Sequence, residues 1–424
     1  MMPEDTTKGI TLERVLEKAN LRAAWLAVKA NGGAPGVDGM DIATTASHLR
    51  DHWDRIEAKL LAGDYQPGAL RAADIPKGSG GTRTPGIPNV LDRMIQQAIH
   101  QVMGPVWEPD CSEHSHGFRP GRSAHDAVRE AQAFIQAGKT WVVDLEMKSF
   151  FDGISHDKLM AQVARKVRDK RLPRLIGGYL RAPLRQPDGS QQKRTKGPPQ
   201  GGPLSPLLAN IYLDPLDQEL EQRGLAFVRY ADDVAIFASS QRSAERIYES
   251  VVEGMEKRLE VVVNREQSGT GPCDQSSLLG FRIYRDGRIG VAPKAIAKPK
   301  DEVRERWDAR QSLTTEQLRE QWQRFIRGWW NYFKLADWRR EVENLSGWIR
   351  RHMRKCFWQR WKTPKGRLNA LKRLGVKGRS LGNAWCAKGA WSMALHWVLT
   401  QALKNKTLEK YGFIIPWSIA EARK

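Results

Sequence analysis

Cysteine is scarce in this sequence, and long apolar runs are missing. The four cysteines, Cys111, Cys273, Cys356 and Cys386, lie far apart and form no C-x-x-C pair, which argues against a disulfide framework and a zinc ribbon. Nowhere do the roughly 18 consecutive apolar residues of a membrane-spanning helix occur, and the N-terminal MMPEDTTKGI lacks the apolar run of a signal peptide. We therefore expect a cytoplasmic protein.

Acidic residues are sparse in the last third of the chain. From Val291 to Lys424 there are 30 Lys and Arg against 11 Asp and Glu, a surplus of 19. The net charge of the whole chain is +21, so the first 290 residues contribute only +2. A surplus of this size predicts binding to a polyanion such as nucleic acid. The alternative is a solvated basic face without a ligand.

Tryptophan is concentrated in the same segment, which holds 12 of the 16 tryptophans. Rings that stack on nucleic-acid bases must be exposed, whereas rings in a core are not. We expect most of these tryptophans to form a core beneath the basic surface.

The periodicity of apolar residues predicts several elements in a chain long enough for two to four folding units. Helical spacing occurs from Leu12 to Lys29, from Asp92 to Met103 and through most of the chain after Val291. Within Trp348 to Lys362, apolar residues share one face, and Arg350, Arg351, Arg354 and Lys355 share the other. A glycine-rich turn joins two short strands of a hairpin within residues 74–88, and further strands are expected at 140–147, 226–230 and 233–238.

Two adjacent carboxylates stand between the last two of these strands. Tyr230-Ala-Asp-Asp233 would form a tight hairpin turn, in which Asp232 and Asp233 repel unless a cation lies between them. The acidic strand from Asp144 to Asp152 could face this turn and complete a set of hard oxygen ligands for Mg²⁺. Two such ions support in-line phosphoryl transfer. An Asp-Asp pair alone is more often ordinary turn chemistry, so the interpretation depends on its context.

The context resembles the reverse transcriptase and maturase proteins encoded by bacterial group II introns, over nearly the whole chain. The matching segments follow one another in the order of that family. They are Gly33–Gly39, Thr84–Pro88, Asp92-Arg93, Gly117–Ser123, Phe150–Asp152, Pro199–Asn210, Tyr230–Asp233, Leu278–Phe281 and Gly328–Phe333.

The resemblance implies an α+β fold of the right-hand polymerase type, with fingers, a palm containing an antiparallel sheet, and a helical thumb. It divides the chain into an N-terminal extension with fingers and the start of the palm (1–140), the palm (141–291), the thumb or maturase domain (292–374) and a basic nucleic-acid-binding region (375–424). No H-N-H or Cys-pair segment occurs in residues 375–424, so we expect no endonuclease domain.

The resemblance also assigns roles to residues. Glu146, Asp232 and Asp233 would be the catalytic metal ligands, for Mg²⁺ or alternatively Mn²⁺. Lys77 and Arg83 would bind the triphosphate of the incoming dNTP. Phe151 would be the aromatic gate that rejects a ribose 2′-hydroxyl, although a core phenylalanine is its simpler interpretation. Gln200 would begin the floor of the nucleotide pocket.

Two residues depart from the family pattern. Glu146 stands where the family has its first metal-binding aspartate, and Gln267 stands where the family usually has lysine, a candidate proton donor. Asp144 does not simply replace Glu146, because residues two apart on a strand are separated by about 6.6 Å. Gln267 cannot act as a general acid. Both departures are compatible with a weak or specialised polymerase.

The function implied is DNA synthesis on RNA and DNA templates by a protein that also binds its own intron RNA. The expected partners are structured intron or template RNA, a DNA primer-template and dNTPs, and the sequence is compatible with a homodimer. One alternative is a free-standing, domesticated relative that acts in DNA repair. Another is an RNA-splicing chaperone with a decayed polymerase site, although Asp232, Asp233, Lys77, Arg83 and Gln200 are all intact.

Overall fold

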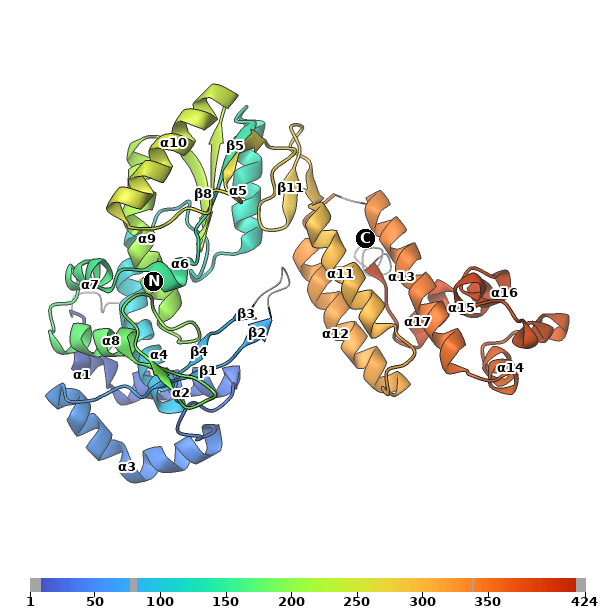
Figure 1. Cartoon of the computed structure of the whole chain (residues 1–424), viewed down its shortest axis with the longest axis horizontal. Coiled ribbons are helices and arrows are strands. Elements are labelled where there is room, and N and C mark those ends of the chain that lie inside the picture. Colours follow the sequence, from blue (N-terminus) through green and yellow to red (C-terminus); the bar gives the residue numbers. More distant parts are fainter. Residues whose placement is uncertain (1–8, 77–81, 338, 417–424) are drawn as a thin grey trace. The chain divides into compact units, whose positions relative to one another are not determined.

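The computed structural model describes residues 9–76, 82–337 and 339–416. The chain divides into two compact units, Met1–Pro272 and Cys273–Lys424, and each is described by itself (Figure 1). No helix in the described ranges is both long and apolar enough to cross a membrane.

The first unit combines helices with short strands. Its elements are α1 (Leu12–Val15), α2 (Lys18–Asn31), α3 (Ile42–Ala62), β1 (Leu70–Ala72), β2 (Ile75–Pro76), β3 (Thr82–Arg83), β4 (Gly86–Ile87), α4 (Val90–Trp107), η1 (Glu108–Asp110), α5 (Ala124–Gln136), β5 (Trp141–Glu146), α6 (Phe150–Gly153), α7 (His156–Ala164), α8 (Arg171–Arg181), β6 (Leu184–Arg185), β7 (Gln191–Gln192), α9 (Ser205–Gln222), β8 (Ala226–Tyr230), β9 (Asp233–Ala238), α10 (Gln241–Arg258) and β10 (Gly269–Pro272).

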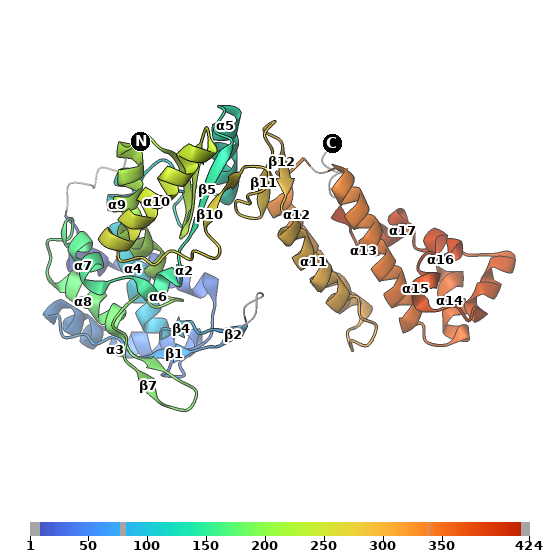
Figure 2. The same ribbon diagram turned by 45° about the horizontal axis from the view of Figure 1, so that its top comes forward.

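The central sheet of this unit is antiparallel and has the strand order β10-β5-β9-β8. Alternate residues of a strand point to opposite faces. On one face, Val143, Leu145 and Ile236 join the core that also contains Val251 and Val252 of α10. Helix α5 covers part of the other face, where its Phe134 ring lies 5.5 Å from that of Phe237. Figures 1 and 2 show the sheet between α10 and α5.

A second sheet, with the order β4-β1-β6-β7, lies near the buried helix α4 in this unit. Strand β1 pairs antiparallel with β4 and parallel with β6, and β2 pairs with β3 in a separate hairpin. The hairpin predicted within residues 74–88 is therefore confirmed, with Ile75 opposite Arg83. Its extension through β1 was not predicted, because Leu70–Ala72 is too short to give a strand pattern of its own.

The single helix predicted from Leu12 to Lys29 is wrong, since the structure has two helices there. Helix α1 ends after one turn, in which Leu12 and Val15 are buried. The Asn20 side chain then donates a hydrogen bond of 2.8 Å to the Val15 carbonyl oxygen. This contact satisfies a backbone acceptor at the end of α1 and allows the chain to begin a new helix, α2.

The second unit is mainly helical. Its elements are β11 (Phe281–Ile283), β12 (Ile289–Val291), α11 (Pro293–Arg306), α12 (Thr315–Phe333), α13 (Arg339–Arg360), α14 (Pro364–Arg373), η2 (Gly378–Trp385), α15 (Ala390–Met393), α16 (Trp397–Ala402) and α17 (Asn405–Lys410). Trp307, Trp322 and Trp358 are fully buried, and the ring of Trp307 packs edge-on against that of Trp322 at 5.6 Å. Tryptophans therefore form part of the core, although Trp385 and Trp397 are exposed.

The basic face expected within Trp348 to Lys362 is partly covered. Its cations, which lie on α13, are only half-exposed because the C-terminal segment packs against them. Arg354 donates two hydrogen bonds to the Leu403 carbonyl oxygen, at 3.2 and 3.1 Å. Arg351 and Lys355 lie over the ring of Trp391, at 5.7 and 5.8 Å from its centre.

Candidate active site

Three of the acidic residues singled out in the sequence lie on two neighbouring strands of the central sheet. Glu146 ends β5 and pairs directly with Asp233, which begins β9. Asp144 pairs with Ala235 instead, two residues further along β9. Residues paired across an antiparallel ladder share one face of the sheet. Glu146 and Asp233 are therefore direct neighbours, and Asp144 lies one pair further from the turn.

The turn that carries Asp232 has little room to move. Ala231 has a φ of 58°, in the left-handed region that few residues other than glycine adopt. Gly117 packs against this turn so closely that a Cβ atom there would lie 2.2 Å from the Ala231 nitrogen. Only glycine fits at position 117 without displacing the turn.

A buried ion pair also holds the turn that carries Asp232. The Arg229 guanidinium donates hydrogen bonds of 2.5 to 3.0 Å to Asp217 on α9, and both side chains are only 1% exposed. It also donates to the Ala231 carbonyl oxygen and to Asn210, each at 3.0 Å. A buried charge is stable only when it is paired and fully hydrogen-bonded. The pair therefore fixes the strand end from which the turn with Asp232 departs.

The carboxylates of the site have no cationic partner in the part of the chain that the structure describes. Burial, followed by the negative charge of Glu146, raises the pKa of Asp144 to about 6. The Asp233 side chain is exposed to water, but the neighbouring protein atoms remove part of its hydration. Burial and the charges of Asp232, Asp144 and Glu146 thus raise the pKa of Asp233 to about 6. Among the described residues, none of these four side chains has an ion pair or hydrogen bond.

These residue types fit a divalent cation. Carboxylate oxygens are the ligands that Mg²⁺ prefers, and a cation would relieve the repulsion that raises the pKa of Asp233. Glu146, Asp232 and Asp233 are the residues that would hold it. In the part of the chain that the structure describes, no three such side chains yet converge on a common point. Their side chains must therefore turn toward one another to bind the ion.

Phe151 and Gln200 share a cavity of about 760 Å³, which is also lined by Arg93, Phe118 and Ser205. Phe150 is buried, as expected for a core residue, whereas Phe151 is half-buried. The Gln200 side chain donates a hydrogen bond of 2.9 Å to Asp152, so the loop before α9 is tied to α6. The structure thus brings the proposed gate and the proposed pocket floor together.

The predicted triphosphate ligands are described only in part. Lys77 lies outside the described residues, and for Arg83 only the backbone, in β3 opposite Ile75, is described. Gln267 lies in a segment that packs directly on the end of β5. The Asn264 amide donates to the Glu146 carbonyl oxygen, and the Glu146 amide donates to Ser268 Oγ, both at 2.8 Å.

Comparison with known proteins adds the family. Residues 75–283 match the model of the reverse transcriptase (RNA-dependent DNA polymerase) family, and residues 296–375 match that of the group II intron, maturase-specific domain. Protein YkfC of Escherichia coli (strain K12) is 31% identical over 346 residues, which cover 70% of this chain and 90% of YkfC. The chain belongs to the group II intron reverse transcriptases. The expected right-hand polymerase fold and RNA-directed DNA polymerase class are thereby confirmed.

A second relative of this reverse transcriptase is the group II intron-encoded protein LtrA of Lactococcus lactis subsp. cremoris. It is 34% identical over 245 residues, which cover 55% of this chain and 41% of LtrA. This chain thus matches less than half the length of LtrA.

Sequence reasoning missed the residues that support the catalytic turn. Asp217 and Asn210 are separated in sequence from Arg229, and a charged residue in a strand usually indicates a solvent-facing position. Only the structure shows that all three are buried together. Phe118 was likewise overlooked, although it lies inside the matched segment Gly117–Ser123.

Proposed function

We propose that this reverse transcriptase extends a DNA primer on RNA and DNA templates with dNTPs. Glu146, Asp232 and Asp233 would hold Mg²⁺, or alternatively Mn²⁺. A bound divalent ion would supply Lewis-acid stabilisation of charge on the transferring phosphoryl group.

One observation carries the proposal. Glu146 lies directly opposite Asp233 at the open end of the sheet, and the two carboxylates have no cationic partner among the described residues. A buried structural carboxylate normally has a hydrogen bond or an ion pair, as Asp217 of α9 does with Arg229. Uncompensated acidic residues on one face are typical of a site that awaits a cation.

The nucleotide would be selected beside this cluster. The ring of Phe151, which lines the cavity, would exclude a nucleotide with a 2′-hydroxyl. Gln200 is fixed to Asp152 and would form the floor beneath the base and sugar. Lys77 and Arg83, on the β2-β3 hairpin segment, would stabilise the negative charge of the triphosphate.

RNA binding would depend largely on the second unit. No Asp or Glu occurs between Glu343 and Glu409, a stretch that contains many Lys and Arg. Lys365, Lys372 and Lys377, in and after α14, are all exposed. The match to the maturase-specific domain and the intron-encoded relative LtrA support structured intron RNA as the ligand.

The salt dependence of RNA binding tests this part of the proposal. Each phosphate contact releases condensed counterions, so log K should fall linearly with log salt, by about 0.7 to 0.9 per contact. Replacing Lys365, Lys372 and Lys377 together by glutamine should weaken binding about 10- to 100-fold at low salt and reduce the slope by about 2. Filter binding or fluorescence anisotropy with a structured RNA measures both quantities.

A matched triple variant controls for the loss of three charges. Lys18→Gln, Lys59→Gln and Lys257→Gln remove exposed lysines of the first unit. This control should leave the salt slope nearly unchanged. Equal losses in the two triple variants would show that the second unit contributes no dedicated RNA surface.

A further inference from the structure

Phe118 is held in an unfavourable conformation at the edge of the nucleotide cavity. Its φ is 59°, in the left-handed region, and its side chain is 49% exposed. Such backbone strain in a bulky residue persists only where the surroundings enforce it, and it is concentrated at functional sites. A phenylalanine on an ordinary exposed surface would relax to a common backbone conformation. The strained φ of Phe118 therefore indicates that the surrounding residues hold it in place.

The backbone that precedes Phe118 is anchored to β8 and α9. The His116 amide donates to the Arg229 carbonyl oxygen at 2.8 Å, and the Arg229 amide donates to the His114 carbonyl oxygen at 2.9 Å. The Gly117 carbonyl oxygen accepts a hydrogen bond of 2.9 Å from Asn210. This segment therefore runs along β8, with Gly117 packed on the turn that bears Asp232.

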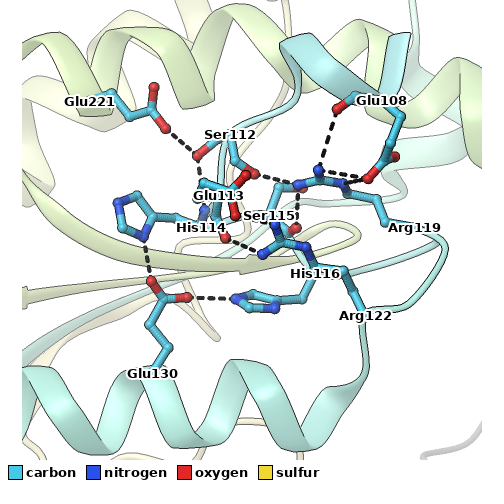
Figure 3. A network of polar contacts seen from close by, with 10 residues as sticks. All are labelled: Glu108, Ser112, Glu113, His114, Ser115, His116, Arg119, Arg122, Glu130 and Glu221. Atoms are coloured by element: carbon cyan, nitrogen blue, oxygen red, sulfur yellow. Dashed lines mark hydrogen bonds and ion pairs between the residues drawn. The ribbon is translucent and has the colours of Figure 1, made fainter. Parts of the chain in front are cut away.

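Side chains reinforce the anchor from the other direction (Figure 3). The Glu130 carboxylate of α5 lies between His114 Nδ1, at 2.5 Å, and His116 Nε2, at 2.6 Å. Burial opposes ionisation of Glu130, but these two hydrogen bonds lower its pKa to about 2. Arg119 binds Glu108 at 2.8 and 3.0 Å and donates to the Ser115 carbonyl oxygen at 2.8 Å.

The anchored segment directs Phe118 toward the proposed gate. The rings of Phe118 and Phe151 are 6.4 Å apart and nearly perpendicular, at 74°. Phe151 also meets Phe150, at 5.4 Å and 70°. Phe151 thus has two aromatic neighbours, of which Phe150 belongs to the core and Phe118 lines the cavity with Phe151.

We propose that Phe118 is a positioning residue that determines sugar specificity by fixing the ring of Phe151 in its excluding orientation. The inference rests on the proposed role of Phe151 as the gate. With Phe118 present, the Phe151 ring cannot turn toward the opening of the cavity to admit a 2′-hydroxyl. Without it, that space is vacant and the gate can rotate. The energy of an edge-to-face aromatic pair is large enough to change the preference for a deoxynucleotide over a ribonucleotide about three- to tenfold.

The test is the ratio of kcat/KM for dATP to that for ATP, opposite uridine in an RNA template. We expect Phe118→Ala to lower this ratio about three- to tenfold, and Phe118→Leu to lower it less. Phe118→Tyr keeps the ring and should retain the wild-type ratio. A general loss of stability would lower both kcat/KM values together and leave the ratio unchanged, so the ratio separates positioning from folding.

Phe151→Ala and the double variant identify the route of the effect. Phe151→Ala should lower the ratio more than Phe118→Ala, and adding Phe118→Ala to it should have no further effect, since the residue through which Phe118 acts is gone. An unchanged ratio in Phe118→Ala, beside a lowered ratio in Phe151→Ala, would overturn the inference and leave the gate intact. Independent, multiplicative effects would also overturn it. An unchanged ratio in Phe151→Ala would instead refute the gate itself.

Discussion

Asp232→Ala should reduce primer extension at least about 1000-fold, because a catalytic metal loses a ligand whose contribution is several kcal/mol. Asp232 lies in the turn that Gly117 packs against and that Arg229 holds through the Ala231 carbonyl oxygen. The turn therefore remains in place when the carboxylate is removed. Asp232→Asn keeps the size of the side chain and removes its charge, and we expect a loss of similar order.

Single-turnover incorporation on a preformed primer-template measures this effect without a contribution from product release. Asp54→Ala, which removes an exposed carboxylate on α3, is the control and should retain the wild-type rate. Asp232→Ala should also bind the primer-template as the wild type does, since the basic surface is unchanged. Wild-type rates in Asp232→Ala would show that the site is assigned wrongly.

Replacing Glu146 by alanine should also abolish extension, whereas Asp144→Ala should have a smaller effect. The register supports this order, because Glu146 pairs with Asp233 and Asp144 pairs with Ala235. Residues two apart on a strand are about 6.6 Å from each other, so Asp144 cannot take the position of Glu146 unless the strand slips. Such a two-residue slip would also move Phe151 out of the proposed gate position and put Ser149 there.

Glu146 is one methylene longer than aspartate, and this length predicts a metal preference. Mg²⁺ demands nearly ideal octahedral geometry, so a displaced carboxylate should favour Mn²⁺ over Mg²⁺ relative to an aspartate enzyme. Glu146→Asp should accordingly preserve or raise the extension rate in Mg²⁺. Rates in Mg²⁺ and Mn²⁺ for the three variants provide the comparison. If extension survives Glu146→Ala but disappears in Asp144→Ala, Asp144 is the ligand.

The strands that carry the site could be predicted closely from the sequence. The segments at 226–230 and 233–238 are bounded by a polar turn and are rich in β-branched and aromatic residues, and both are strands in the structure. The register of Glu146 against Asp233 was not predicted, since the sequence indicated only that the acidic strand could face the turn.

The supports of the site could not be predicted, because they depend on partners distant in sequence. Arg229 finds Asp217 only through the packing of β8 on α9, and Glu130 meets two histidines only after α5 covers the sheet. The half-burial of Arg354 has the same origin, since its acceptor, Leu403, comes 49 residues later. The early end of α1 was missed because the Asn20 cap interrupts an unbroken apolar pattern.

The most direct test of the central claim is incorporation of a single dNTP by the purified wild-type chain on an RNA template with a DNA primer. We expect incorporation of the complementary nucleotide in Mg²⁺ or Mn²⁺, and none after chelation of the metal. A folded protein that binds the primer-template but incorporates no nucleotide with either metal would contradict the assignment of Glu146, Asp232 and Asp233 as a working polymerase site.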